Sequence, residues 1–173
     1  MNLDLRQIQG PRDRIRRNFQ GTEVGPGGGD QYTVVDTVTL DLEVRKDGTK
    51  YLVVGRLDAT LELECCRCLE PVRRGVGLAV DLMYLPASEN SREGEVKLEE
   101  SDLRTAFYVD SQIDLGQLMH EQFQLALPMK PLCGDDCHGL CAVCGGNRNK
   151  TACQCVETWA DPRLAVLKRL LNQ

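Results

Sequence analysis

The sequence lacks the long apolar runs that membrane insertion and secretion require. No stretch approaches the roughly 18 apolar residues of a membrane-spanning helix. The N-terminal MNLDLRQIQGPRDRIRRNF has no continuous apolar segment of the kind found in secretory signals. We therefore expect a soluble cytosolic protein that has no membrane partner.

Aromatic residues, histidine and catalytic motifs are scarce as well. Aromatic residues make up only 5% of the 173 residues, although hydrophobic residues at 42% suffice for a core. The two histidines are expected to be a packing or surface residue (His120) and a loop residue (His138). The sequence contains no P-loop, dinucleotide-binding fingerprint, HExxH or GxSxG motif. It thus gives no reason to expect an enzyme or a small-molecule substrate.

A strong positive charge is also missing. The formal net charge is −5. A zinc ion bound by four thiolates carries a further negative charge, so metal sites would make the protein more acidic still. Any RNA binding must therefore depend on local basic patches rather than on the charge of the whole chain.

Cysteine is the residue type that the sequence has in abundance. Six of the nine cysteines lie within residues 133–155, and the other three lie in ECCRCLEP at residues 64–71. Since no export signal is found, a reducing compartment is indicated, in which thiols bind metal or do redox chemistry rather than form disulfides.

Apolar and polar residues alternate between residues 32 and 85, which predicts an antiparallel sheet. The alternation is clear in TVTLDLEVR at 37–45 and in YLVVGRLDATLELEC at 51–65. Asp47-Gly48 between them is a strong hairpin signal. A third strand places Leu78, Val80, Leu82 and Tyr84 on one side. The predicted fold is α+β: a three-stranded meander with the cysteines of 65–68 at the tip of its second hairpin.

Helical periodicity appears in three places. The main helix is predicted near 114–127, with Asp114 as N-cap and an end before Pro128. RDRIRRNF at 12–19 favours a short amphipathic helix with a basic face. DPRLAVLKRLLNQ at 161–173 favours a terminal helix with a leucine stripe.

The remaining segments complete the predicted organisation. MNLDLRQI at the start resembles a strand, and 86–105 an acidic surface loop with a short edge strand at 95–98. We expect an antiparallel β-sheet domain over 1–128, with a cysteine-rich zinc module over 129–173 docked on it.

The cysteine spacings form four pairs that can each bind one metal ion. C-x-x-C lets a tight turn bring two sulfurs together, and Gly145 after the second such motif tolerates the positive φ that turns backbone N–H groups toward thiolates. A spacing of four places sulfurs one helical turn apart, and C-x-C places them on one side of an extended segment. The pairs are Cys65 with Cys68, Cys133 with Cys137, Cys141 with Cys144, and Cys153 with Cys155. Cys66 is left over.

Eight ligands suffice for one or two tetrahedral zinc sites. The local partition puts Cys141, Cys144, Cys153 and Cys155 around one ion, and Cys65, Cys68, Cys133 and Cys137 around the other. Four thiolates with no open position make a structural site rather than a catalytic one. An iron–sulfur cluster is an alternative, because it also needs only four cysteines. A dithiol redox pair is another, although Cys65 ends a strand and does not begin a helix.

The same motifs resemble those of the YceD family, described as large ribosomal RNA subunit accumulation proteins. The resemblance rests on LECCRCLEPV at 63–72, on LALPMKPLC at 125–133, and on Cys137 through HGLCAVCGGNRN to Cys153 and Cys155. It implies a bacterial or organellar cytosolic protein, here a bacterial cytoplasmic one, involved in synthesis, processing or stability of large-subunit ribosomal RNA. It provides no catalytic residues.

We therefore expect a non-enzymatic ribosome assembly factor whose partner is the large-subunit precursor, either its rRNA or a ribosomal protein. Clustered arginines at rigid turns can contact phosphates. The candidate contacts are Arg67, Arg73, Arg74, Arg148 and Lys150, with Arg12, Arg16 and Arg17 near the start. The alternative is a zinc–thiol redox switch or redox-regulated chaperone, because C-x-x-C followed by C-x-C can release zinc on oxidation.

Overall fold

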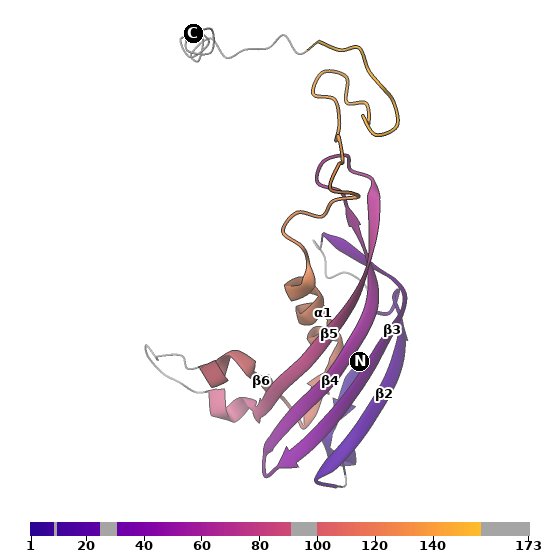
Figure 1. Cartoon of the computed structure of the whole chain (residues 1–173). Helices are drawn as coiled ribbons and strands as arrows, with labels where there is room; N and C mark the ends of the chain where they lie inside the picture. Colours follow the sequence, from indigo (N-terminus) through magenta and orange to yellow (C-terminus); the bar gives the residue numbers. More distant parts are fainter. Residues whose placement is uncertain (9, 25–30, 91–99, 157–173) are drawn as a thin grey trace, which may run out of the picture.

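A curved five-stranded sheet forms the body of the protein (Figure 1). The computed structural model describes residues 1–8, 10–24, 31–90 and 100–156. The strands are β2 (Arg12–Gln20), β3 (Tyr32–Asp47), β4 (Lys50–Glu64), β5 (Pro71–Pro86) and β6 (Thr105–Tyr108), in that spatial order. Neighbours among β2–β5 are antiparallel, and β6 runs parallel to β5. The predicted meander is confirmed as β3–β5, and the structure adds a strand at each edge.

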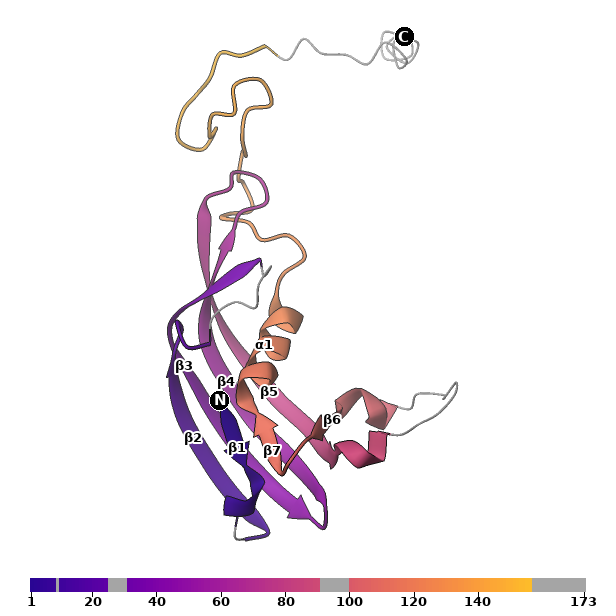
Figure 2. The same ribbon diagram turned by 180° about the vertical axis from the view of Figure 1, so that it is seen from behind.

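One face of the sheet is covered by a second layer (Figure 2). This layer holds a small antiparallel pair, β1 (Asn2–Asp4) with β7 (Gln112–Asp114), and the helix α1 (Leu115–Ala126). The Asp114 carboxylate accepts hydrogen bonds from the backbone N–H groups of Gly116 and Gln117, so the predicted N-cap is confirmed. Three short 3-10 helices, Leu5–Gln7, Ala87–Asn90 and Glu100–Arg104, complete the elements in the described part of the chain.

The hydrophobic core lies between these two layers. Alternate residues of β3, from Val38 to Val44, are fully buried, as are Leu57 and Leu61 of β4. They pack against the apolar side of α1, where Phe123 makes an edge-to-face contact with Tyr32 at 6.0 Å between ring centroids. The period of two in the sequence therefore places one face of the sheet in the core and leaves the other to solvent.

The predicted basic helix at 12–19 is wrong, because this segment is the strand β2. All nine of its residues pair with β3, from Arg12 opposite Arg45 to Gln20 opposite Thr37. Ile15 and Phe19 share one face of a strand as well as one face of a helix, so their spacing fits both structures. Pairing with β3 satisfies the backbone and packs both side chains against the core, whereas an eight-residue helix is marginal by itself.

Other expectations are met in part. The strand expected at the N-terminus is short: only Asn2–Asp4 form β1, and a 3-10 helix follows it. The edge strand expected at 95–98 and the terminal helix expected at 161–173 lie outside the described residues. The division at residue 128 stays a prediction. Among the described residues, no helix has the length and apolar character that crossing a membrane requires.

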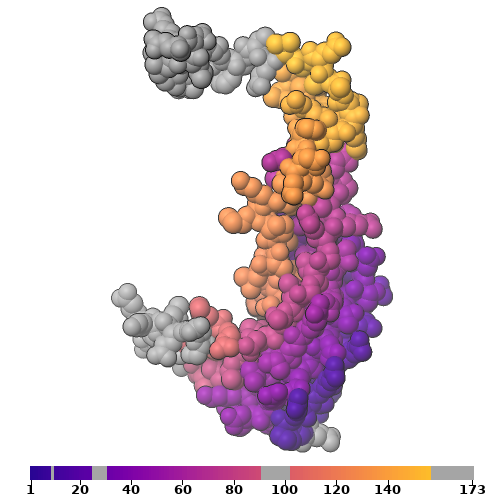
Figure 3. Space-filling model, in the orientation of Figure 1, coloured from indigo at the N-terminus to yellow at the C-terminus, as the bar shows by residue number. Residues whose placement is uncertain are grey.

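The β4–β5 hairpin extends beyond the covering layer, and the chain that follows α1 returns to its tip (Figures 1 and 3). There the backbone N–H of Cys66 donates to the carbonyl of Pro131 at 2.9 Å. Cysteines that are far apart in the sequence therefore come together at the hairpin tip.

The buried side of α1 should dominate the stability of the body. Phe123 is fully buried, so Phe123→Ala should lower the free energy of unfolding by about 3–5 kcal/mol, through lost burial and the cavity left behind. Leu125→Ala on the same helix is the matched control, since Leu125 is 81% exposed and should change that free energy by less than about 0.5 kcal/mol. Urea unfolding of both variants measures the difference, and equal losses would contradict this packing.

Candidate metal centres

The tip of the β4–β5 hairpin is a tight turn that presents two cysteine sulfurs. The backbone N–H of Leu69 donates to the Cys65 carbonyl, and that of Cys65 to the Glu70 carbonyl, both at 2.9 Å. Leu69 has φ +61°, which closes the turn before β5 begins. Cys65 and Cys68 are buried, while Cys66 is exposed. The turn thus separates the C-x-x-C pair from the leftover cysteine, as the alternation along the strand indicates.

The segment of residues 131–137 lies against this turn and is fastened to it by two arginines. Arg67 Nη1 donates to the carbonyls of Asp135 at 3.2 Å and Cys137 at 2.9 Å. Arg74 Nη2 donates to the Leu132 carbonyl at 3.2 Å. Cys133 and Cys137 are not on a helical turn. Instead the Cys137 N–H bonds to the Gly134 carbonyl at 3.2 Å in a local turn.

Four sulfurs meet here in what we call the hairpin centre, formed by Cys65, Cys68, Cys133 and Cys137. All four lie within 4.8 Å of one another. The Cys65–Cys137 separation is 3.8 Å and the Cys68–Cys133 separation is 3.6 Å. A tetrahedral ion with metal–sulfur bonds of about 2.3 Å places its ligands about 3.8 Å apart, whereas a disulfide needs about 2.05 Å. The spacing therefore fits one metal ion and not disulfides.

A second set of four sulfurs forms the knuckle centre: Cys141, Cys144, Cys153 and Cys155, again within 4.8 Å of one another. Gly145 has φ +70°, so the predicted left-handed glycine is confirmed. Its N–H bonds to the Cys141 carbonyl at 2.9 Å, and the Cys141 N–H bonds to the Gly146 carbonyl at 2.8 Å. The structure thus brings the eight cysteines together in the two groups that the spacing indicates, and each group can hold a metal ion.

Backbone N–H groups make each centre favourable to thiolate. Burial raises the pKa of the Cys65 thiol, but hydrogen bonds from the backbone of Arg67, Cys68 and Cys133 outweigh it and lower the pKa to about 6. In the knuckle centre, backbone hydrogen bonds from Cys144 and Val143 lower the pKa of Cys141 to about 6.

Other thiols in the same centres shift the opposite way. Hydrogen bonding to the Cys137 and Cys68 sulfurs raises the pKa of Cys133 to about 12, and the Cys144 sulfur does the same for Cys155. Crowded thiols cannot all ionise without a cation among them.

The two centres are linked by the polar residues of the loop between 147 and 150. Lys150 Nζ forms an ion pair with Glu70 at 2.7 Å, and Asn147 Nδ2 donates to the same Glu70 oxygen at 3.2 Å. Asn149 Nδ2 donates to the Cys137 sulfur at 3.2 Å, and its Oδ1 accepts from the backbone N–H of His138. Sequence reasoning missed Glu70 and both asparagines, because their partners lie some 80 residues away or across a loop and follow no spacing rule.

The basic residues expected to contact RNA mostly bind within the chain. Arg67 and Arg74 hold the 131–137 segment and Lys150 holds Glu70, as described above. Arg73 pairs with Glu62 of β4 at 2.9 Å, and Arg148 is exposed. The side chains of Arg67, Arg74 and Lys150 thus connect the cysteine-rich segment to the hairpin. A contact of any of the five residues with RNA stays a prediction.

Cys66 stands outside both centres and borders an open hollow. The hollow has a volume of about 810 Å³ and is lined by Cys66, Leu69, Met129 and Tyr32, among others. Tyr32 Oη lies 3.0 Å from Nδ1 of His120, so that histidine takes part in packing, as predicted. Neither histidine belongs to a cysteine group.

Comparison with known proteins finds a matching family. The family model described as "Large ribosomal RNA subunit accumulation protein YceD" matches residues 53–171, a span that contains both centres. Uncharacterized proteins of Mycobacterium tuberculosis and Mycobacterium bovis are each 35% identical to the chain over 150 residues, which are 83% of this chain and 65% of theirs. The chain therefore spans 65% of the length of these relatives.

A plant protein is also similar. The "Large ribosomal RNA subunit accumulation protein YCED homolog 1, chloroplastic" of Zea mays is 23% identical over 176 residues, which cover 88% of this chain and 60% of the maize protein. No solved structure matches.

The position of Cys66 predicts a selective thiol reaction. With both centres filled by metal, iodoacetamide should modify one thiol per chain rapidly, because the other eight are ligands and Cys66 is exposed outside the groups. Mass spectrometry of the intact protein counts the adducts. Cys66→Ser should abolish the rapid adduct and leave the slow ones unchanged. Rapid modification of three or more thiols in the metal-loaded protein would contradict the two four-sulfur groups.

Proposed function

Because the chain belongs to the YceD family, we propose that it is a non-enzymatic factor that supports the accumulation of large-subunit ribosomal RNA. The observation that carries this proposal is the family match over 53–171, which includes most of the β4–β5 hairpin, α1 and both centres. The maize relative carries the same description. A factor of this kind acts where ribosomes are assembled, here the bacterial cytoplasm, on a precursor of the large subunit.

The donor sets support a structural role for the metal in this function. Each centre offers four thiol sulfurs, and four-sulfur coordination leaves no position open for a substrate or an activated water. When bound, the metal supplies charge neutralisation and a fixed tetrahedral link. The residues of the chain do the rest: Arg67 and Arg74 hold the 131–137 segment, and Glu70 holds the loop of residues 147–150.

Zinc is the ion that these sites favour. Soft thiolate donors in a tetrahedral arrangement select zinc or iron–sulfur chemistry. In a four-iron cluster each cysteine binds a different iron, which spreads the sulfurs apart, whereas sulfur separations of 3.6 and 3.8 Å fit one shared ion. We infer one zinc ion in each centre. The redox-switch alternative has the more exposed knuckle thiols in its favour, but the comparisons favour the ribosomal RNA role.

The metal content tests the zinc sites directly. Protein purified without added metal or chelator should contain two zinc ions per chain by elemental analysis. Cys65→Ser with Cys68→Ser should remove one ion, Cys153→Ser with Cys155→Ser should remove the other, and Cys66→Ser should retain both. Detection of iron together with acid-labile sulfide would instead identify an iron–sulfur cluster. Absence of metal, together with disulfides formed under mild peroxide, would support the switch instead.

The cellular role has a separate test. Deleting the gene should lower the ratio of large-subunit to small-subunit ribosomal RNA, and the wild-type gene should restore it. The Cys66→Ser gene should restore the ratio as well, whereas the double variant of Cys65 and Cys68 should not, because the hairpin tip loses its metal link. Quantifying both RNAs by capillary electrophoresis measures the effect. An unchanged ratio in the deletion strain would overturn the proposed function.

A further inference from the structure

The outer face of the sheet carries charged side chains where the inner face carries the core. In Figures 1 and 3 this face is turned toward the viewer, and Figure 2 shows that α1, β1 and β7 cover the opposite one. Along β2 the exposed outward positions include Arg12, Arg14 and Arg16, which lie opposite Arg45, Glu43 and Asp41 of β3. As a strand, β2 aligns Arg12, Arg14 and Arg16 in one row at a spacing of about 6.8 Å.

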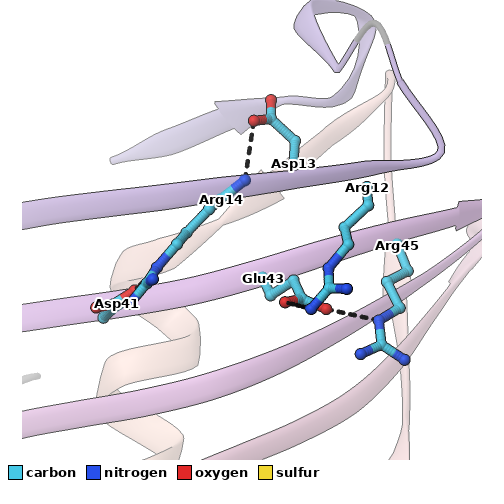
Figure 4. Close-up of polar contacts among 6 residues, drawn as sticks. All are labelled: Arg12, Asp13, Arg14, Asp41, Glu43 and Arg45. Atoms are coloured by element: carbon cyan, nitrogen blue, oxygen red, sulfur yellow. Dashed lines mark hydrogen bonds and ion pairs between the residues drawn. The ribbon is translucent and has the colours of Figure 1, made fainter.

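These side chains form an ion-pair network, and Figure 4 draws all of them except Arg16. Asp41 accepts two hydrogen bonds from Arg14, at 2.9 Å from Nε and 2.8 Å from Nη2, and Arg16 Nε lies 4.0 Å away. Glu43 pairs with Arg12 and accepts a hydrogen bond of 2.6 Å from Arg45 Nε. Hydrogen bonding to Arg14 lowers the pKa of Asp41, and hydrogen bonding to Arg12 and Arg45 lowers that of Glu43. Both carboxylates are thus charged at neutral pH.

The positive charge in this network is in excess and lies outermost. Four arginines surround two carboxylates. The Asp41 and Glu43 side chains are only 24% and 21% exposed, whereas the four arginine side chains are 51% to 74% exposed. The acids are therefore recessed beneath a layer of guanidinium groups. Each guanidinium has five N–H donors, and these ion pairs use one or two of them, so donors remain to face an incoming anion.

Three other arginines are each balanced by one acid. Arg56 pairs with Asp58, Arg73 with Glu62, and Arg104 with Asp81, each as one cation with one anion. Near the knuckles, Arg67, Arg74 and Lys150 are engaged within the chain. Among the described residues, the network on β2 and β3 gathers four arginines around two acids, in a chain whose formal net charge is −5.

We propose that this surface, the arginine face formed by Arg12, Arg14, Arg16 and Arg45, binds the phosphate backbone of ribosomal RNA; the proposal rests on the proposed function. Arginine matches phosphate geometry with two parallel hydrogen bonds, and a row of arginines matches a chain that carries one charge per nucleotide. None of the outward-facing residues of β2, nor of the β3 residues paired with them, is aromatic. The arginine face therefore offers no side chain on which bases could stack. The contact therefore positions RNA and does not read its sequence.

The test measures RNA affinity of the full chain as a function of salt. The probes are a transcript of a large-subunit ribosomal RNA domain and an oligouridine, with fluorescence anisotropy as the readout. Arg14→Ala with Arg16→Ala should lower the association constant about tenfold at about 50 mM salt and reduce the slope of its logarithm against log salt by roughly 1.5. The matched control, Arg6→Ala with Arg104→Ala, removes the same charge from one-to-one ion pairs with Asp4 and Asp81 and should change affinity less than about threefold.

A variant that is expected to strengthen RNA binding distinguishes this proposal from a loss of binding caused by misfolding. Asp41→Asn removes a recessed anion, keeps every arginine and should tighten binding of both probes. Equal affinity and salt slope in wild type, Arg14→Ala with Arg16→Ala, and Asp41→Asn would overturn the arginine face. So would a wild-type protein that binds neither RNA, or one that binds phosphatidylglycerol vesicles and not RNA. Those outcomes leave the proposed function standing if the deletion strain still loses large-subunit RNA, so the two failures are distinguishable.

Discussion

The tip of the β4–β5 hairpin depends on four thiol sulfurs that lie within 4.8 Å of one another. Hydrophobic packing contributes little there, since among the described residues only Val72 and Leu132, both partly buried, pack against the buried sulfurs of Cys65, Cys68 and Cys137. The backbone stabilises thiolate at Cys65, and thiolates at this spacing repel unless a cation lies among them. A bound metal ion would therefore stabilise this end of the molecule, as the hydrophobic core stabilises the body.

The same centre joins distant parts of the chain. It links the turn after β4 to the segment after α1, and the intervening residues build β5, β6, β7 and the helix itself. Glu70 extends the link, because it accepts from both Asn147 and Lys150 and so fastens the knuckle loop to the hairpin. Arg67 and Arg74 direct N–H donors to backbone carbonyls in these links, whereas on β2 and β3 four arginines share two carboxylates and keep donors exposed.

Local signals in the sequence predicted those parts of the fold that depend on neighbours along the chain. Asp47-Gly48 gave the hairpin, Asp114 the helix start, and the cysteine spacing the two groups of four. The errors have a common physical origin. Ile15 and Phe19 satisfy a helical and an extended period equally, and only the pairing of β2 with β3 decides between them. The parallel strand β6 and the partners of Glu70 likewise depend on contacts across long sequence distances.

The sheet connects the two proposed functional surfaces as a stiff element. Arg56 of β4 lies opposite Asp41 beside the arginine face, and Cys65 follows the last residue of the same strand. Nine residues of extended chain separate the two positions by about 30 Å. Because β4 is hydrogen-bonded on both sides, that separation is set by the ladder and not by a linker. An RNA strand held by β2 and β3 would thus be kept at a fixed distance from whatever the metal-linked tip contacts, so the fold itself would set the spacing between the two contacts.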